Sequence, residues 1–276
     1  MKHPTGIPLC PKSLDSNDER KIQMPEIGQM MLFSLIFMRM SGFILLNPIW
    51  GRKNIPAQVK GGMIMVFTLL IYSFSSAQVP EPVNSIEFAV LLLKELAVGF
   101  AIGFVMELFL MIITFAGTIM DFQMGLSMAM IYDPQTNAQI ALTGTLYQAY
   151  FILLFFAVDG HLALFRLLIN SAEIVPYGQV VLGSRAAWAM LEIFIQCITM
   201  AVKFAFPLIA IEFLTEIAVG VLMKIIPQIN VFVVNIQAKI AIGFIMLIFL
   251  FSPMTDYVGG VISQMLLTVQ DIIRLL

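Results

Sequence analysis

Residues 116–134, AGTIMDFQMGLSMAMIYDP, separate the third and fourth long apolar runs of the chain. The stretch has glycines at 117 and 125, methionines at 120, 124, 128 and 130, and one acid inside its apolar part, Asp121, which Gln123 follows closely. A connector between membrane helices is ordinarily polar, whereas this one is mostly apolar. We therefore expect it to lie inside protein rather than in water.

Two interpretations of this stretch remain open on composition. Glycine permits backbone conformations closed to other residues, and methionine packs against surfaces of changing shape. The segment could therefore be a deformable stopper in a pore. It could equally be an ordinary re-entrant loop or the start of a helix.

The composition of the whole chain predicts an integral membrane protein. Of the 276 residues, 60% are hydrophobic and 12% are charged, and the mean hydropathy is +0.95, far from the balance of a soluble domain. The net charge of −2, without clustered Lys and Arg, gives no reason to expect a nucleic-acid partner. Neither the two cysteines nor the two histidines have the spacing of a metal site, and no catalytic or phosphate-binding motif is present, so we expect no enzymatic activity, metal or cofactor.

The apolar runs predict an all-α fold with about six helical regions, at 27–47, 61–78, 86–116, 138–158, 186–226 and 229–252. At 1.5 Å per residue the runs 86–116 and 186–226 measure roughly 46 and 60 Å, against about 30 Å for a hydrocarbon core. Either they fold into hairpins or they are not wholly embedded in lipid. Pro207 predicts a kink, because it leaves the carbonyl of Lys203 without its helical donor. Lys and Arg counts in the connectors give no clean orientation.

The chain divides into three parts by composition. Residues 1–25 are polar and proline-rich, and we expect a disordered extension or an uncertain start there. Residues 26–255 form the membrane domain. Residues 256–276 carry apolar side chains with a helical period and predict an amphipathic helix that packs on the protein or on a partner.

A stripe of charged and small residues follows one face of the third run. Glu95, Gly99, Gly103 and Glu107 are four residues apart, and Lys94 precedes them. The two glycines allow another backbone to approach closely, and ionisable groups at membrane depth should be paired and face protein or water. The stripe predicts either contacts between subunits or along a conduit, or pairing within the chain that fixes its own helices.

The fifth run repeats this pattern with Glu212 and Glu216, one turn apart. Two such acids repel each other unless a cation lies nearby, and Lys203, Lys224 and Lys239 are the candidates. Paired intramembrane acids also occur in stand-alone ion-coupled transporters, which is the main competing functional class. Against it, the two halves of the chain have no matching interrupted helices.

Several separated motifs resemble the FliR family of flagellar export-gate proteins, whose counterparts in virulence secretion systems are called SctT. The motifs are Arg39-x-x-Gly42 with Pro48, Ile55-Pro56 with Val59-Lys60, Lys94-Glu95-Leu96 with Gly99 and Gly103, Ala116-Gly117, Asp121-x-Gln123-x-Gly125-x-Ser127, Asp133-Pro134, Asp159-Gly160-His161 and PQINVFVVNIQAKI at 227–240. The resemblance covers about residues 27–255. In the last motif, which contains Pro227, Gln228, Asn230 and Lys239, the NIQAK at 235–239 departs from the glycine-phenylalanine-proline form expected there. The motif is more similar to flagellar than to virulence relatives.

The resemblance implies a subunit of a type III export gate in the bacterial inner membrane, at the flagellar basal body. Such a subunit is built from kinked helical hairpins and assembles helically with FliP- and FliQ-like subunits. FlhB- and FlhA-like export proteins contact the complex, and unfolded flagellar subunits pass through it. The equivalent subunit of a virulence system is an alternative.

The resemblance also implies that a loop of this subunit plugs the closed pore. Carried over to this sequence, the plug comprises Gly117, Ile119, Met120, Asp121, Phe122, Gln123, Met124, Gly125 and Met128. The hypothesis is passive gating, in which dry apolar side chains seal the conduit against ions and yield to a passing substrate.

Overall fold

The computed structural model describes residues 16–52, 54–75, 84–126, 131–133, 138–180, 183–226 and 231–276, without the side chains of 16–27, 131–133, 138–140, 231 and 232. The helices are α1 (Ser16–Leu46), α2 (Ala57–Phe74), α3 (Ser85–Gln123), α4 (Leu142–Ala157), α5 (Gly160–Ile174), α6 (Ser184–Ile225), α7 (Val231–Phe249) and α8 (Phe251–Leu275). Two short antiparallel strands, β1 (Ile131–Asp133) and β2 (Ala138–Ile140), join α3 to α4. The predicted all-α membrane fold is confirmed, with this small hairpin as its one unexpected element in the described residues.

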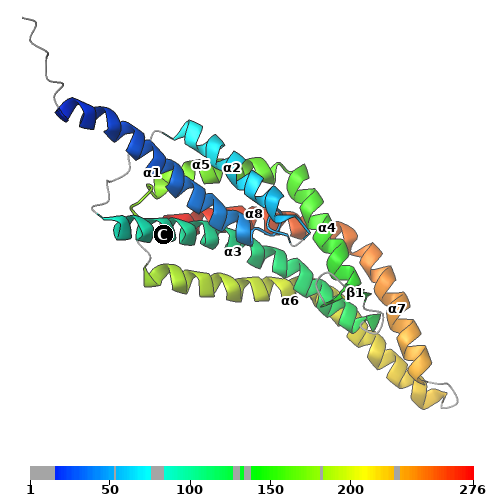
Figure 1. Cartoon of the computed structure of the whole chain (residues 1–276). Coiled ribbons are helices and arrows are strands. Elements are labelled where there is room, and N and C mark those ends of the chain that lie inside the picture. The colour runs from blue at the N-terminus through cyan, green and yellow to red at the C-terminus, as the bar shows by residue number, and fades with distance from the viewer. Residues whose placement is uncertain are drawn as a thin grey trace, which may run out of the picture.

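Helix α3 is the centre of the bundle. It contacts α1, α4, α6 and α8, and Figure 1 shows it running between α1 and α6. Of the 18 consecutive residues that make up its most apolar stretch, 67% are buried, against 22% for the corresponding stretch of α6. A helix that is apolar on all sides is stable when protein or lipid surrounds it, and α3 is covered for the most part by its own chain.

The number of described helices that could cross a membrane agrees with the prediction of about six helical regions. Five of the described helices are long and apolar enough to cross a membrane, and α4 with α5, bent by 68°, gives a sixth if the pair counts as one span. The helix α7 is apolar but shorter over its described side chains, Val233–Phe249.

The two long runs are continuous helices of 39 and 42 residues, α3 and α6. The alternative that each run folds back on itself is therefore wrong. Instead, α6 and α7 together form a hairpin that extends beyond the end of α3 (Figure 1). Pro207 lies inside α6, which changes direction along its length in Figure 1. At roughly 60 Å each, these helices are longer than a hydrocarbon core is thick.

The C-terminal helix packs on the protein itself. The helix α8 begins five residues before the predicted segment and contacts α3, α4, α5, α6 and α7. Its apolar face is buried, while Asp271 and Arg274 are exposed on the other side. At the other end of the chain, α1 begins at Ser16, within the predicted extension 1–25, and residues 1–15 lie outside the described residues.

Candidate functional site

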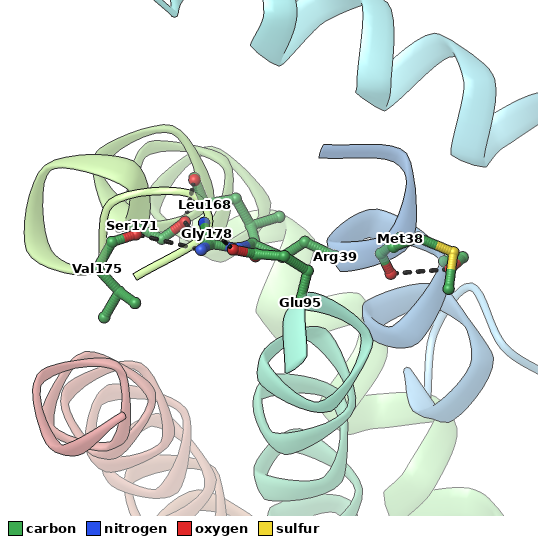
Figure 2. Close-up of polar contacts among 8 residues, drawn as sticks. Met38, Arg39, Glu95, Leu168, Ser171, Val175 and Gly178 are labelled. Atoms are coloured by element: carbon green, nitrogen blue, oxygen red, sulfur yellow. Dashed lines mark hydrogen bonds and ion pairs between the residues drawn. The ribbon is translucent and has the colours of Figure 1, made fainter. Parts of the chain in front are cut away.

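A buried ion pair joins three separate parts of the chain. The Nε of Arg39 on α1 donates to Oε2 of Glu95 on α3 at 2.6 Å, and both side chains have no exposed surface. Arg39 also donates from Nη1 to Oγ of Ser171 on α5 and from Nη2 to the carbonyl of Val175, each at 3.1 Å. Figure 2 shows these groups converging from α1, α3 and α5. We call Arg39, Glu95, Ser171, Val175 and Gly178 the arginine cluster.

The turn after α5 completes the arginine cluster. The backbone N–H of Gly178 donates to Oε1 of Glu95 at 2.9 Å, so both carboxylate oxygens are used. The guanidinium carbon of Arg39 lies 4.3 Å from the ring centroid of Tyr177, within cation–π range. Burial raises the pKa of the Tyr177 hydroxyl to about 12, against the opposing effect of the Arg39 charge. Each charge in the cluster is therefore hydrogen-bonded, which a buried ion pair requires to be stable.

Glycines bring α1 and α3 close enough for this pairing. The position of a Cβ on Gly99 is occupied by the carbonyl oxygen of Arg39, and that on Gly42 by the carbonyl oxygen of Leu96. A Cβ on Gly103 would lie 2.7 Å from the carbonyl oxygen of Phe43. Of the two interpretations of the 95–107 stripe, the geometry therefore agrees with packing inside the chain for its glycines and Glu95.

The ends of the charged stripe lie outside the arginine cluster. Lys94 is half-buried and Glu107 is exposed, and neither takes part in the contacts of the cluster. On α6, the helix that carries Glu212 and Glu216, the predicted residues Lys203, Pro207 and Lys224 are exposed.

The segment predicted as a plug begins as helix rather than as a loop. The helix α3 continues to Gln123, and Gly125, with a φ of 75°, ends it. This backbone conformation favours glycine and is common just after a helix. The prediction of a connector from residue 116 is therefore wrong by about two turns. The loop that remains starts at Gly125 and contains β1 and β2.

The side chains of this segment divide by burial. Met120 and Met124 are fully buried, and Phe122 is 71% exposed. Ile119, Gln123 and Gly125 are half-buried. Met128 lies outside the described residues.

Asp121 and Gly117 clamp the base of the loop. The Asp121 carboxylate, 1% exposed, accepts from the backbone N–H of Thr143 at 3.2 and 3.1 Å. This N–H is one of the free donors at the start of α4, where Ala141 at the N-cap provides no side-chain acceptor. Next to it, the backbone of Gly144 occupies the position of a Cβ on Gly117. The two ends of the loop are thus held together by α3 and α4.

The hairpin of α6 and α7 carries the second acidic pair. Lys239 donates from Nζ to Oε1 of Glu216 at 3.0 Å, so of the three candidate cations Lys239 is the partner. Glu212, one turn away, is 1% exposed, and its carboxyl oxygens have no hydrogen-bond partner among the described residues. Of the final family motif, Lys239 is described, and Pro227, Gln228 and Asn230 lie outside the described residues.

The sequence-based predictions missed the partners supplied by loops and helix ends. Ser171, Val175, Gly178 and Thr143 were not predicted, because three of them contribute through the backbone, where residue type carries little signal. The Pro-Tyr-Gly sequence at 176–178 is a turn signal that could have directed attention to this segment.

These features define a class: an all-α membrane protein with a fully paired ion pair in its core and an apolar loop clamped at the end of its central helix. Residues 30–265 match the family model described as bacterial export proteins, family 1. The chain belongs to this family.

Relatives of known name agree with the family model. The chain is 32% identical over 247 residues to the flagellar biosynthetic protein FliR of Bacillus subtilis (strain 168), covering 88% of this chain and 95% of the relative. It is 27% identical over 236 residues to FliR of Escherichia coli (strain K12), covering 86% and 90%. It is 26% identical over 250 residues to the Yop proteins translocation protein T of Yersinia pestis, covering 90% and 94%. The predicted FliR-family resemblance is confirmed, and the stand-alone transporter is not favoured.

Proposed function

We propose that the protein is the FliR-like subunit of a flagellar-type protein export gate in the bacterial inner membrane, at the flagellar basal body. Its expected partners are FliP- and FliQ-like subunits, with FlhB- and FlhA-like proteins in contact with the complex. Unfolded flagellar subunits are the substrates, and the protein itself has no enzymatic activity. The 32% identity to the flagellar biosynthetic protein FliR of Bacillus subtilis, against 26% to the Yop proteins translocation protein T of Yersinia pestis, supports this assignment over a virulence system.

Within such a gate, the segment from Phe122 to β2 is the plug. The observation that carries this proposal is the clamp of Asp121 on Thr143 and of Gly117 on Gly144. A plug must move without disturbing the helices that carry it, and a loop tied at its base can do so. Phe122, which is 71% exposed at the end of α3, offers an apolar contact to a neighbouring subunit or to the opposite wall of a conduit.

The long helices fit a gate that extends out of the bilayer. The helices α3 and α6 exceed the thickness of a hydrocarbon core, and much of the apolar surface of α6 has no cover from the rest of the described chain. Such surface needs lipid or other subunits. Because a family of export-apparatus components works as a complex, we assign part of this surface to FliP- and FliQ-like neighbours.

The proposal is tested by replacing residues 126–140 with a short Gly-Ser linker, which leaves Asp121, Thr143 and both glycines of the clamp in place. A deletion that starts at residue 118 would remove the clamp as well, and is less informative. The variant is produced with its partner subunits, and ion leakage through membranes containing the complex is measured. We expect normal assembly and increased leakage. A matched control replaces residues 76–83, between α2 and α3, with the same linker and should not leak.

A further inference from the structure

The first residue beyond α3, Met124, is held between α6 and α7. Met124 is fully buried. Its Cγ and Sδ lie 2.5 and 2.9 Å from the position that a Cβ on Gly243 would take, and Oε1 of Glu212 lies 3.0 Å from the same position. The Met124 thioether and the Glu212 carboxyl thus share the space in front of the Gly243 Cα. We call Met124, Glu212 and Gly243 the methionine seat.

The pairing of α6 with α7 builds this seat. The ion pair between Glu216 and Lys239 fixes the register of the two antiparallel helices. One turn further, four residues before Glu216 and four after Lys239, Glu212 and Gly243 face each other. A glycine at 243 leaves the space into which Met124 inserts, and any other residue there would fill it.

The Glu212 carboxyl is unusual in its surroundings. It is 1% exposed, and neither oxygen has a hydrogen-bond partner among the described residues. The charged groups that act on it are Lys239 on α7, already bonded to Glu216, and Glu216 on its own helix. From α3 it faces a thioether, and from α7 a glycine backbone. An ionised carboxylate without hydrogen bonds is costly in such a site, whereas the neutral acid is tolerated.

We propose that Glu212 is a protonated acid that holds Met124 in the closed loop, and that loss of this proton to entering water releases Met124 from the hairpin. The methionine seat is therefore a proton-dependent latch. When the latch opens, water hydrates the Glu212 carboxylate. The nearest ammonium group is that of Lys239, which is paired with Glu216 one helical turn along α6. The consequence for gating rests on the proposed function, because Met124 lies in the segment assigned as the plug.

The latch predicts a sign for the pH dependence. The closed form binds one proton more than the open form, so raising the pH favours the open form. Between the pH at which the hydrated carboxyl of the open form ionises and the pH at which the closed form would lose its proton, the open population should increase by up to about tenfold per pH unit, the limit for release of a single proton.

Oxidation of native methionines measures this opening directly. The complete complex, with its partner subunits, is treated with dilute hydrogen peroxide from about pH 5 to about pH 9. Sulfoxide formation at each methionine is then quantified by peptide mass spectrometry. Met30, which is 71% exposed, reports the intrinsic reaction at each pH. The rate at Met124 relative to Met30 should rise with pH.

Two variants at acids of α6, one inside the methionine seat and one outside it, separate the latch from general loosening. Glu212→Gln keeps the shape of the side chain and cannot ionise, so Met124 should stay protected at every pH. Glu192→Gln removes an exposed acid of the same helix outside the methionine seat and should retain the pH-dependent rise. A Met124 rate that is independent of pH in the unmodified protein, or the same rise in Glu212→Gln, would overturn the latch.

The outcomes also separate the latch from the plug. If the latch is correct but the loop does not seal a pore, Met124 oxidation depends on pH while ion leakage through the complex does not change on replacing 126–140. If the loop seals a pore but the latch is wrong, that replacement leaks and Met124 oxidation is flat with pH.

Discussion

Removing the acid of the arginine cluster should be among the most destabilising single changes in the chain. In Glu95→Ala, the buried Arg39 loses its 2.6 Å partner and the Gly178 N–H loses its acceptor. Breaking a buried pair by deleting one partner costs about 3–5 kcal/mol, because the remaining charge is left uncompensated. The remaining bonds of Arg39, to Ser171 and to the Val175 carbonyl, cannot neutralise its charge.

A double variant gives the matched control for this prediction. In Arg39→Met/Glu95→Met neither charge is buried, and replacing both members of a buried pair with apolar residues is often close to neutral. We expect the double variant to be more stable than Glu95→Met or Arg39→Met alone, with a coupling free energy of about 2 kcal/mol or more.

The buried thiol of Cys197 provides the assay. Cys197 is 5% exposed on α6, so in a Cys10→Ser background its labelling by a maleimide during a denaturant titration reports unfolding. The midpoint of the titration is compared among the unmodified protein, both single variants and the double variant. Additive effects, with the double variant as unstable as the sum of the single ones, would refute the account of the arginine cluster.

Two further changes test the helix contacts. Gly99→Ala places a methyl group against the Arg39 carbonyl and should lower the free energy of unfolding by at least about 2 kcal/mol in the Cys197 assay. Its control is Gly61→Ala, where a Cβ meets nothing within 4 Å, and this change should be neutral or slightly stabilising. Equal effects of the two changes would contradict the close crossing of α1 and α3. Asp121→Ala should lower the free energy of unfolding by about 1–2 kcal/mol, because the start of α4 loses its cap. The same change should speed backbone amide exchange at residues 142–145. Unchanged exchange there would show that the carboxylate does not hold α4.

The helical stripe in α3 shows what a sequence pattern can predict and what it cannot. The spacing of Glu95, Gly99 and Gly103 predicts a close approach and a buried, paired charge, and both are found. The pattern could not identify the partner, because periodicity defines a face of one helix and not the helix that covers it. Arg39 stands 56 residues before Glu95, and only the crossing of α1 and α3 brings them together.

Gly117 explains the error in the length of α3. A glycine inside a helical pattern costs about 1 kcal/mol relative to alanine, so residues 116–134, with glycines at 117 and 125, resemble a connector. Here the role of Gly117 is the close contact with Gly144, and the helix continues for six more residues, to Gln123. Tertiary contact, which the local sequence does not encode, outweighs the cost of the glycine.

The two acids of α6 show a second limit. Glu212 and Glu216 have the same residue type one turn apart, yet Glu216 is paired with Lys239 while Glu212 is buried without a partner. The difference arises from what lies opposite on α7 and from the inserted Met124. A sequence pattern treats these two positions alike.

The central claim is that the loop between α3 and α4 seals a conduit, and ion leakage through the assembled complex tests it most directly. With residues 126–140 replaced by a short linker and the clamp intact, the account predicts a complex of normal composition that conducts ions. A complex of normal composition that remains as tight as the unmodified one would contradict the claim.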